Sequence, residues 1–274
     1  MYTITDKRVL NETTVMMKIN APKVAKKAGP GQFIIFRVDE KGERVPLTIA
    51  GYDRDSGDVQ IIFQAVGAST KRLAQLNVGD TICDFVGPLG KATELDGYKK
   101  AAVIGGGLGC AIAYPQAKYL FENGCDVDII AGFRSKDIII LEDEMKACSN
   151  DLTIMTDDGS NGNKGLVTDA LKAKIEAGEK YDLVIAIGPP VMMKFVCMLT
   201  KQYNIKTIVS MNPIMVDGTG MCGGCRVTVD GQTKFACVDG PDFDGHAVNF
   251  DELIARNRTY AEREEHACRM LQNM

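Results

Sequence analysis

The sequence predicts an antiparallel β-barrel, then a doubly wound parallel sheet flanked by helices, then a small cysteine-rich domain. Short alternating strands separated by turn residues fill the first hundred residues. Buried strands then alternate with helical sequence, and three closely spaced cysteines follow near the end. We expect the barrel at 1–97, the α/β domain at 98–210, the cysteine-rich domain at 211–245 and a C-terminal helical extension at 246–274.

Composition narrows the class of protein. The 274 residues are 45% hydrophobic and carry a net charge of −4, without a basic run that would predict a nucleic-acid or membrane-surface partner. No apolar stretch reaches the roughly 18 residues that span a bilayer. Nine cysteines are an odd number spread over a long chain, which indicates a reducing compartment rather than a disulfide framework. We therefore expect a cytoplasmic protein with no nucleic-acid or membrane partner.

The barrel is expected from five short strands, and two stretches beside them have the chemistry of a binding site. The strands are expected within 13–20, 31–38, 45–52, 58–66 and 80–86. Arg44 to Thr48, RVPLT, places a cation, a rigid turn and a hydroxyl at the head of one strand. Gly67 to Thr70 precedes the amphipathic run KRLAQL, so a helix starting there would present free amides to a phosphate. Ser69 or Thr70 is equally compatible with an ordinary helix N-cap.

The α/β half is expected from buried strands that end in glycine-rich turns. The strands lie in KAAVIGGGLG, DVDIIAGF, LTIMTD, LVIAIG and KTIVSM, with helical sequence such as LVTDALKAKIEAG between them. After the first strand we expect a helix with Pro115 near its first turn and Gly124 as its stop signal.

Ligands of such sheets bind at the carboxyl ends of the strands, where four turns are expected to meet. The turns are Gly105–Gly109, Gly132–Arg134, Asp157–Gly159 and Gly188–Pro190. The pattern differs from G-x-G-x-x-G, and no acidic residue ends the second strand to bind a ribose hydroxyl. Arg134 stands there instead, so the sequence leaves NAD and NADP both open.

The cysteine-rich stretch has the spacing of an iron-sulfur ligand frame. Plant-type [2Fe-2S] sites use C-x4-C-x2-C and a distant fourth cysteine. Here Asp217 takes the place of the first thiolate, ahead of Cys222, Cys225 and Cys237, with glycines between them. A hairpin turning at Asp230-Gly231 would bring Cys237 back to the loop.

The CxxC pair of this stretch also fits a zinc knuckle or a redox pair. No nearby histidine completes a short-spaced zinc site, and a redox pair normally opens a helix, whereas this one lies among glycines before a hairpin. Asp217 also fits a simple cap of the glycine turn, with water, Cys268 or another group completing the metal site. The residues alone leave these alternatives open.

Together these motifs resemble the ferredoxin-NADP reductase superfamily over essentially the whole chain. RVPLT resembles its flavin-contact stretch, GASTKRL its flavin-pyrophosphate turn, GPLGKA at 87–92 its inter-domain motif, and GGGLG its nicotinamide loop. Two groups within it are similar: the electron-transfer subunits of dihydroorotate dehydrogenase, and the small subunits of NADH-dependent reduced ferredoxin:NADP oxidoreductase. The first group generally supplies four cysteines, whereas the second is similar to this chain in having Asp and then three cysteines, so the second is favoured.

The resemblance implies an electron-transfer subunit that binds FAD, NAD(H) and a [2Fe-2S] cluster. Its large partner would carry flavin and [4Fe-4S] clusters, use NADP(H), and bifurcate electrons between NADH, NADPH and ferredoxin. No catalytic acid or base is expected, because hydride passes directly between nicotinamide and flavin. The implied cofactor-binding residues are Arg44, Pro46, Leu47, Thr48, Gln64, Ala65, Gly67, Ser69, Thr70, Gly105, Gly106, Gly107, Leu108, Gly109, Arg134, Asp158, Gly188 and Pro189, and the implied cluster ligands are Asp217, Cys222, Cys225 and Cys237.

Two other functions and two roles for the tail stay open. The chain fits the dihydroorotate dehydrogenase partner role, or a non-enzymatic, zinc-stabilised nucleotide sensor. The charged helical tail is either a solvated helix with Leu253, Ile254 and Tyr260 packed locally, or a docking segment for the partner.

Overall fold

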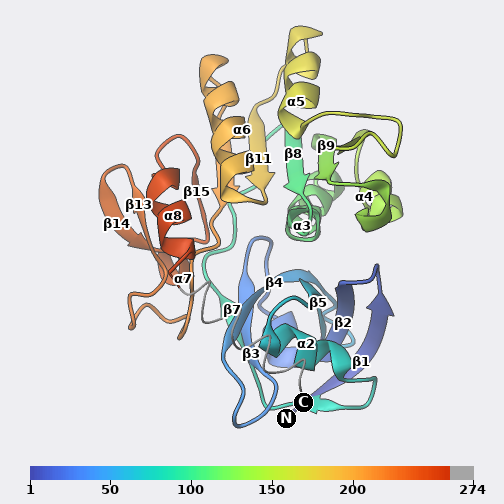
Figure 1. Cartoon of the computed structure of the whole chain (residues 1–274), viewed down its shortest axis with the longest axis vertical. Coiled ribbons are helices and arrows are strands. Elements are labelled where there is room, and N and C mark those ends of the chain that lie inside the picture. Colours follow the sequence, from blue (N-terminus) through green and yellow to red (C-terminus); the bar gives the residue numbers. More distant parts are fainter. Residues whose placement is uncertain (260–274) are drawn as a thin grey trace.

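The structure is a computed structural model that describes residues 1–259. Its first part is a seven-stranded sheet with the order β6-β1-β2-β5-β4-β3-β7, in which every pair is antiparallel and which curls into a nearly closed barrel (Figure 1). The elements of this part are β1 (Tyr2–Val9), β2 (Thr14–Asn20), α1 (Pro22–Ala25), β3 (Phe33–Arg37), β4 (Val45–Tyr52), β5 (Asp58–Gln64), α2 (Ala68–Gln75), β6 (Thr81–Ile82) and β7 (Asp84–Leu89).

The barrel strands follow the predicted alternation, with two differences. The run 80–86 forms two strands, because the amide of Cys83 leaves the ladder and donates to the carbonyl oxygens of Arg37 and Val38, each at 3.1 Å. Strand β1 was not predicted. Only Ile4 of its eight residues is buried, so it lacks the alternation that signals a half-buried strand.

The second part is a six-stranded sheet with the order β10-β9-β8-β11-β12-β15. Its first five strands are parallel, and the order reverses between β8 and β11. One face is covered by α3 and α4 and the other by α5 and α6, so the predicted doubly wound sheet is confirmed. The elements are β8 (Lys100–Gly106), α3 (Gly109–Glu122), β9 (Asp126–Phe133), η1 (Lys136–Ile138), α4 (Glu142–Ala147), β10 (Asp151–Thr156), α5 (Val167–Glu176), β11 (Leu183–Ile187), α6 (Pro190–Gln202), β12 (Thr207–Ser210) and β15 (Asp242–Asp244).

The expected position of Pro115 is wrong. Helix α3 begins directly after the glycine-rich turn, so Pro115 is its seventh residue and lies inside it. Proline removes the hydrogen bond to the carbonyl four residues earlier. Burial of Ala113, Ala117 and Leu120 on the sheet stabilises the helix around this defect, since packing outweighs local propensity. The stop signal at Gly124 is confirmed by its φ of +83°.

The third part combines the cysteine-rich loop with a hairpin, and its chain then returns to the second sheet. The hairpin turns at Asp230 and Gly231, both at positive φ, as a two-residue hairpin turn requires. Strand β15 then pairs antiparallel with β12. Helix α8 packs against α6 and β13, with Leu253 buried, whereas Tyr260 lies outside the described residues. The elements are β13 (Arg226–Val229), β14 (Gln232–Phe235), α7 (Ala236–Asp239) and α8 (Phe250–Asn257).

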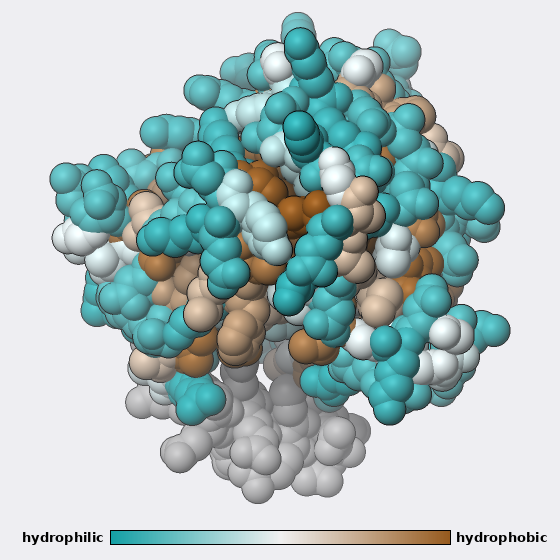
Figure 2. All heavy atoms as spheres, turned by 90° about the horizontal axis from the view of Figure 1, so that it is seen from above, coloured by the Kyte–Doolittle hydropathy of each residue, from teal (hydrophilic) through white to brown (hydrophobic). Residues whose placement is uncertain are grey.

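Barrel and sheet share one core, which fixes their relative position. Helix α3 packs against β4, and Met16, Ala50 and Ile62 of the barrel join the cluster formed by α3 and its sheet face (Figure 1). The carboxyl ends of β8 and β11 therefore face the barrel. The opposite end, formed by α5 and α6, is mostly hydrophilic with hydrophobic residues gathered near its middle (Figure 2). None of the helices within residues 1–259 is long and apolar enough to cross a membrane.

Candidate functional site

The predicted flavin residues lie on β4, at the end of β5 and at the start of α2. Pro46, Leu47 and Thr48 pair with β3, so their backbone is fixed by the barrel. Helix α2 has Gly67 as its N-cap, so the expectation of Ser69 or Thr70 at that position is wrong. Thr70 is the third helical residue, and its hydroxyl accepts from the amide of Gly67 at 3.1 Å. This hydrogen bond satisfies the amide of the N-cap residue. It leaves the remaining first-turn amides available to a ligand.

The glycines of the nucleotide loop are required mainly by contacts within the chain. A Cβ on Gly109 would lie 2.2 Å from the carbonyl oxygen of Ile187, and one on Gly105 would lie 2.7 Å from the Cys110 sulfur. A Cβ on Gly106 would lie 2.4 Å from the Met192 sulfur. Gly107 differs from these three, because it has a φ of +56° and open space around its Cβ direction. The loop therefore packs β8, α3 and β11 closely, and only Gly107 faces free space.

The structure brings the predicted nucleotide residues together at one edge. Gly105–Gly109 and Gly188–Pro189 follow β8 and β11, the two strands between which the order reverses. Open α/β sheets bind ligands at this point. Farther along the edge, the amide of Asp158 donates to the carbonyl of Arg134 at 3.2 Å, so the loops after β9 and β10 are joined. Binding of a dinucleotide along this edge, from β10 to β11, stays a prediction.

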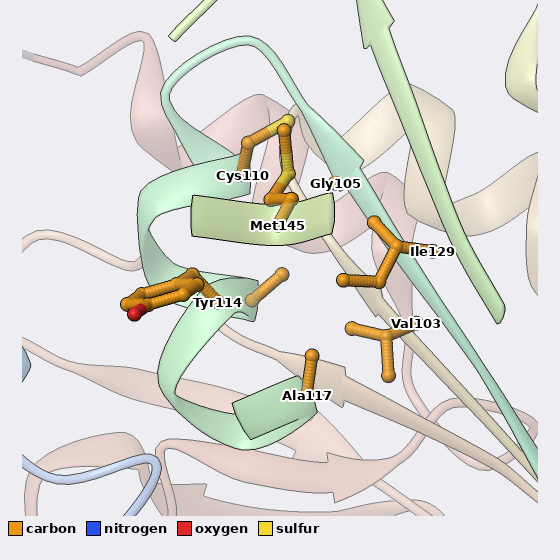
Figure 3. Close-up of a pocket in the computed structure, with 8 residues that line it drawn as sticks. Val103, Gly105, Cys110, Tyr114, Ala117, Ile129 and Met145 are labelled. Atoms are coloured by element: carbon orange, nitrogen blue, oxygen red, sulfur yellow. The ribbon is translucent and has the colours of Figure 1, made fainter. Parts of the chain in front are cut away.

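A narrow apolar cavity with no room for a water molecule lies beneath the glycine-rich loop, between the sheet and helices α3 and α4 (Figure 3). Cys110 and Met145 meet at one end of it, and the Tyr114 hydroxyl points away. Burial raises the pKa of the Cys110 thiol to about 12, so this cysteine stays neutral. The cavity belongs to the core packing rather than to a polar ligand site.

The cluster loop, residues 211–225, contains no helix or strand and is shaped by glycines and one carboxylate. Gly218, Gly220 and Gly223 have positive φ, which suits a backbone crowded round a ligand, whereas Gly224, for which we expect the same, does not. The carboxylate of Asp217 accepts from the amide and hydroxyl of Thr219 and, at 2.9 Å, from the amide of Cys222. These bonds from Cys222 and Thr219 hold the pKa of Asp217 well below its ordinary value, so the group is an anion. In the structure Asp217 therefore caps the glycine turn, and its role as an iron ligand stays a prediction.

The three cysteines differ in burial. Cys225 and Cys237 are buried with their sulfurs 3.1 Å apart, whereas Cys222 is exposed. Burial and the neighbouring Cys225 raise the pKa of Cys237 to about 12, so metal binding must release its proton. Within residues 1–259 no three His, Cys, Asp or Glu groups are close enough to form a preassembled metal site. The donor set still fits a [2Fe-2S] cluster, because three thiols and an anionic oxygen lie on one glycine-rich loop and its hairpin.

The cluster loop is seated on the barrel beside the predicted flavin strand. A Cβ on Gly218 would lie 2.4 Å from Ile35 on β3 and 2.9 Å from Leu89 on β7. Arg44 reaches the same loop, with its guanidinium 3.5 Å from the carbonyl oxygen of Asp217. The flavin strand and the cluster loop are therefore direct neighbours, a relation that the sequence does not reveal.

A polar contact joining all three parts was also not predicted. Asp242 of β15 accepts hydrogen bonds from Thr93, in the linker after the barrel, and from Gln116 of α3, the latter at 2.8 Å. Its second oxygen is buried without a partner among the described residues. Burial raises the pKa of Asp242. An aspartate after Gly-Pro in a loop gives no sequence signal for such a role.

Models of two protein families match this chain. Residues 103–198 match the oxidoreductase NAD-binding domain. Residues 212–249 match the iron-sulfur cluster binding domain of dihydroorotate dehydrogenase B. The second match covers Asp217, Cys222, Cys225 and Cys237, and it argues against the zinc knuckle and the non-enzymatic sensor.

Similar proteins extend the match to nearly the whole chain. An uncharacterised protein of Clostridium beijerinckii is 53% identical over 96% of this chain and 92% of its own length. A Thermotoga maritima homolog of the electron transfer subunit of dihydroorotate dehydrogenase B (NAD(+)) is 48% identical over 90% of this chain and 87% of its own. A solved structure of NADH-dependent reduced ferredoxin-NADP oxidoreductase is 44% identical, covers 99% of this chain and 98% of that one, and has a TM-score of 0.94. The ferredoxin reductase of carbazole 1,9a-dioxygenase, 20% identical with a TM-score of 0.62, shares only the fold over 73% of this chain and 64% of its own.

These comparisons confirm the predicted class of fold and of activity. Barrel, NAD-binding sheet and iron-sulfur domain occur in the expected order, and FAD, NAD(H) and a [2Fe-2S] cluster are the cofactors that this fold and these domains support. The chain belongs to the NAD-linked electron-transfer subunits related to dihydroorotate dehydrogenase B and NADH-dependent reduced ferredoxin-NADP oxidoreductase, within the ferredoxin-NADP reductase superfamily.

Proposed function

We propose that this chain is the small subunit of an electron-bifurcating complex that exchanges electrons between NADH, NADPH and ferredoxin. Its large partner would carry flavin and [4Fe-4S] clusters and would use NADP(H). The observation that carries the proposal is the likeness to the NADH-dependent reduced ferredoxin-NADP oxidoreductase structure, at 44% identity and 99% coverage. The replacement of the first cysteine of the ligand spacing by Asp217 supports the same choice.

The residues of this chain would bind, orient and shield the cofactors rather than transfer protons. Flavin bound here would supply the conversion between two-electron hydride transfer from NADH and single-electron transfer. Arg44 to Thr48 and the start of α2 would hold the flavin between barrel and sheet. Gly107 and the turn at Gly188 would set the position of the nucleotide, since hydride transfer depends on close and correct alignment.

The cluster loop would be the exit for electrons. Cys222 is exposed, and the apolar side chains of Val216, Met221 and Val238 around it are 54%, 89% and 38% exposed. Such a patch on a cofactor loop suits a partner surface, since exposed apolar patches commonly mark interaction sites. We place the large subunit on this patch.

The test is reconstitution. The chain would be purified anaerobically with a large subunit of the proposed kind from the same organism, and NADH, NADP⁺ and ferredoxin would be varied separately. Reduction of NADP⁺ that requires NADH and reduced ferredoxin together supports the proposal. Full activity with NADH alone contradicts bifurcation.

A second candidate is the electron-transfer subunit of dihydroorotate dehydrogenase. It is favoured by the iron-sulfur domain match and by relatives such as the Clostridium perfringens subunit, 32% identical over 82% of this chain. Dihydroorotate-dependent reduction of NAD⁺ by a complex with a dihydroorotate dehydrogenase would establish this role. Failure to form that complex would exclude it.

A further inference from the structure

The end of β9 lacks an acidic residue, and the loop that follows β10 supplies one beside it. In dinucleotide-binding sheets a carboxylate at the end of the second strand accepts a hydrogen bond from the adenosine ribose 2′-hydroxyl. Here β9 ends at Phe133 and Arg134 follows. The amide of Asp157 donates to the carbonyl of Phe133 at 3.0 Å, and that of Asp158 donates to Arg134 at 3.2 Å. Asp158 therefore lies next to the position that the usual acidic residue would occupy.

The side chain of Asp158 is fixed in place by a short chain of hydrogen bonds. Its Oδ1 accepts from the amide of Ser160 at 2.9 Å and from the Ser160 hydroxyl at 2.7 Å. The same hydroxyl accepts from the amide of Lys136 at 2.7 Å, so the carboxylate is tied to the segment after β9. These bonds from Ser160 lower the pKa of Asp158, and its side chain is exposed to a ligand. The group is an oriented, accessible anion.

We propose that Asp158 makes the nucleotide site selective for NAD(H) over NADP(H). Its carboxylate would accept hydrogen bonds from the adenosine ribose and repel a 2′-phosphate. Selectivity of this kind combines an attraction for one ligand with a repulsion against the other. The inference rests on the proposed function, because it requires a nicotinamide dinucleotide along this edge.

The other charges at this edge set the size of the expected effect. Arg134 and Lys136 are exposed cations without an ion pair in the part of the chain that the structure describes, and Asp157 is a second exposed carboxylate. Asp137 and Lys164, also exposed nearby, carry opposite charges. Loss of the Asp158 charge leaves the edge with an excess of cations, which would favour a phosphate.

The experiment measures binding of two nucleotide fragments to the FAD-loaded full chain by calorimetry. The fragments are ADP-ribose and 2′-phospho-ADP-ribose, which differ only at the proposed contact. We expect the unaltered protein to prefer ADP-ribose. Asp158→Asn should shift the ratio of the two dissociation constants toward the phosphorylated fragment by at least about tenfold, the scale of one hydrogen bond to a charged group. Asparagine keeps an oxygen for Ser160, so the loop retains its anchor.

Asp157→Asn is the matched control. It removes the same charge one residue away, from a side chain that has no hydrogen bond to the loop in residues 1–259, and should change the ratio less than about threefold. Equal shifts in both variants, or a preference of the unaltered protein for the phosphorylated fragment, would overturn the inference while leaving the proposed function intact. Failure of both fragments to bind would overturn the nucleotide site itself.

Discussion

The nucleotide edge and the cluster loop are positioned by different means. At the nucleotide edge, parallel strands and helix α3 crowd the glycines so closely that a Cβ on Gly109 would overlap the Ile187 carbonyl. The cluster loop has no helix or strand over residues 211–225, and Asp217 and three positive-φ glycines set its path. The sheet thus builds one site in advance, whereas the other depends on a few hydrogen bonds and on the metal. Variants at the first site should act through packing, and variants at the second through ligand chemistry.

The largest effect is expected where packing decides the site. Gly106→Val would place a side chain against Met192 and Pro189, whose nearest atoms lie 2.4 and 3.0 Å from the added Cβ. The Met192 side chain and the Pro189 ring must shift to make room, and a displacement of about 1 Å in a reacting pair costs about a hundredfold in rate. We expect NADH-driven reduction of the bound flavin to slow by that factor in stopped-flow absorption, while dithionite still reduces the flavin. Gly124→Ala, at positive φ in open space, is the control and should keep the NADH rate.

The next largest effect tests whether the chemical identity of the side chain at Asp217 determines the properties of the cluster. Asp217→Cys should keep the cluster, change its visible and paramagnetic-resonance spectra, and lower its midpoint potential, because a thiolate donates more electron density to iron than a carboxylate does. Asp217→Asn loses the charge and keeps one oxygen, which can accept from Thr219 or from Cys222 but not from both. If Asp217→Cys and Asp217→Ala both retain the parent spectrum, Asp217 is not a ligand.

The contrast between the two regions also explains what the sequence predicts. Strands and glycine turns of the α/β half follow from local periodicity, because a buried parallel strand is a continuous apolar run. The ligand spacing of the cluster loop is likewise local, and the matched iron-sulfur domain covers it. Both are patterns within about twenty residues.

Contacts between residues that are far apart in the chain could not be predicted from the sequence. Arg44 lies 173 positions from Asp217 and contacts its carbonyl, and Asp242 binds Gln116 across 126 positions. Asp158, whose amide donates to the carbonyl of Arg134, likewise lies in the loop after another strand, β10. The position of Pro115 in α3 is predicted wrongly, because packing against the sheet stabilises the helix around a helix-breaking residue. Such pairs depend on how the elements pack, which local periodicity does not encode.

A smaller effect is expected where the two regions meet, at Arg44. Its guanidinium contacts the cluster loop, and we expect it to bind the anionic flavin, which suits a planar, always charged donor. Arg44→Ala should weaken FAD retention by about tenfold without unfolding the barrel, because one charged hydrogen bond is lost. The measurement is flavin content after gel filtration, compared with Lys18→Ala, which removes an exposed ion pair to Asp6 elsewhere on the barrel. Full flavin occupancy in Arg44→Ala would count against its assignment.

The smallest effect is expected at Asp242, which joins β15 to α3 and to the linker after the barrel. Its pKa is raised by burial, so the folded state keeps its proton to higher pH than the unfolded state does. The contribution of this carboxyl to the free energy of unfolding is therefore fully present below its unfolded pKa of about 4. It is lost as pH rises through the folded pKa. Asp242→Asn removes the titration while an amide oxygen can still accept from Thr93 and Gln116. We expect the variant to gain about 1 kcal/mol over the parent in urea unfolding at pH 8 and nothing at pH 4. Asp244→Asn, on the exposed part of the same strand, should show no such difference between the two pH values, and an unchanged pH profile in Asp242→Asn would mean that the carboxyl is ionised in the folded protein.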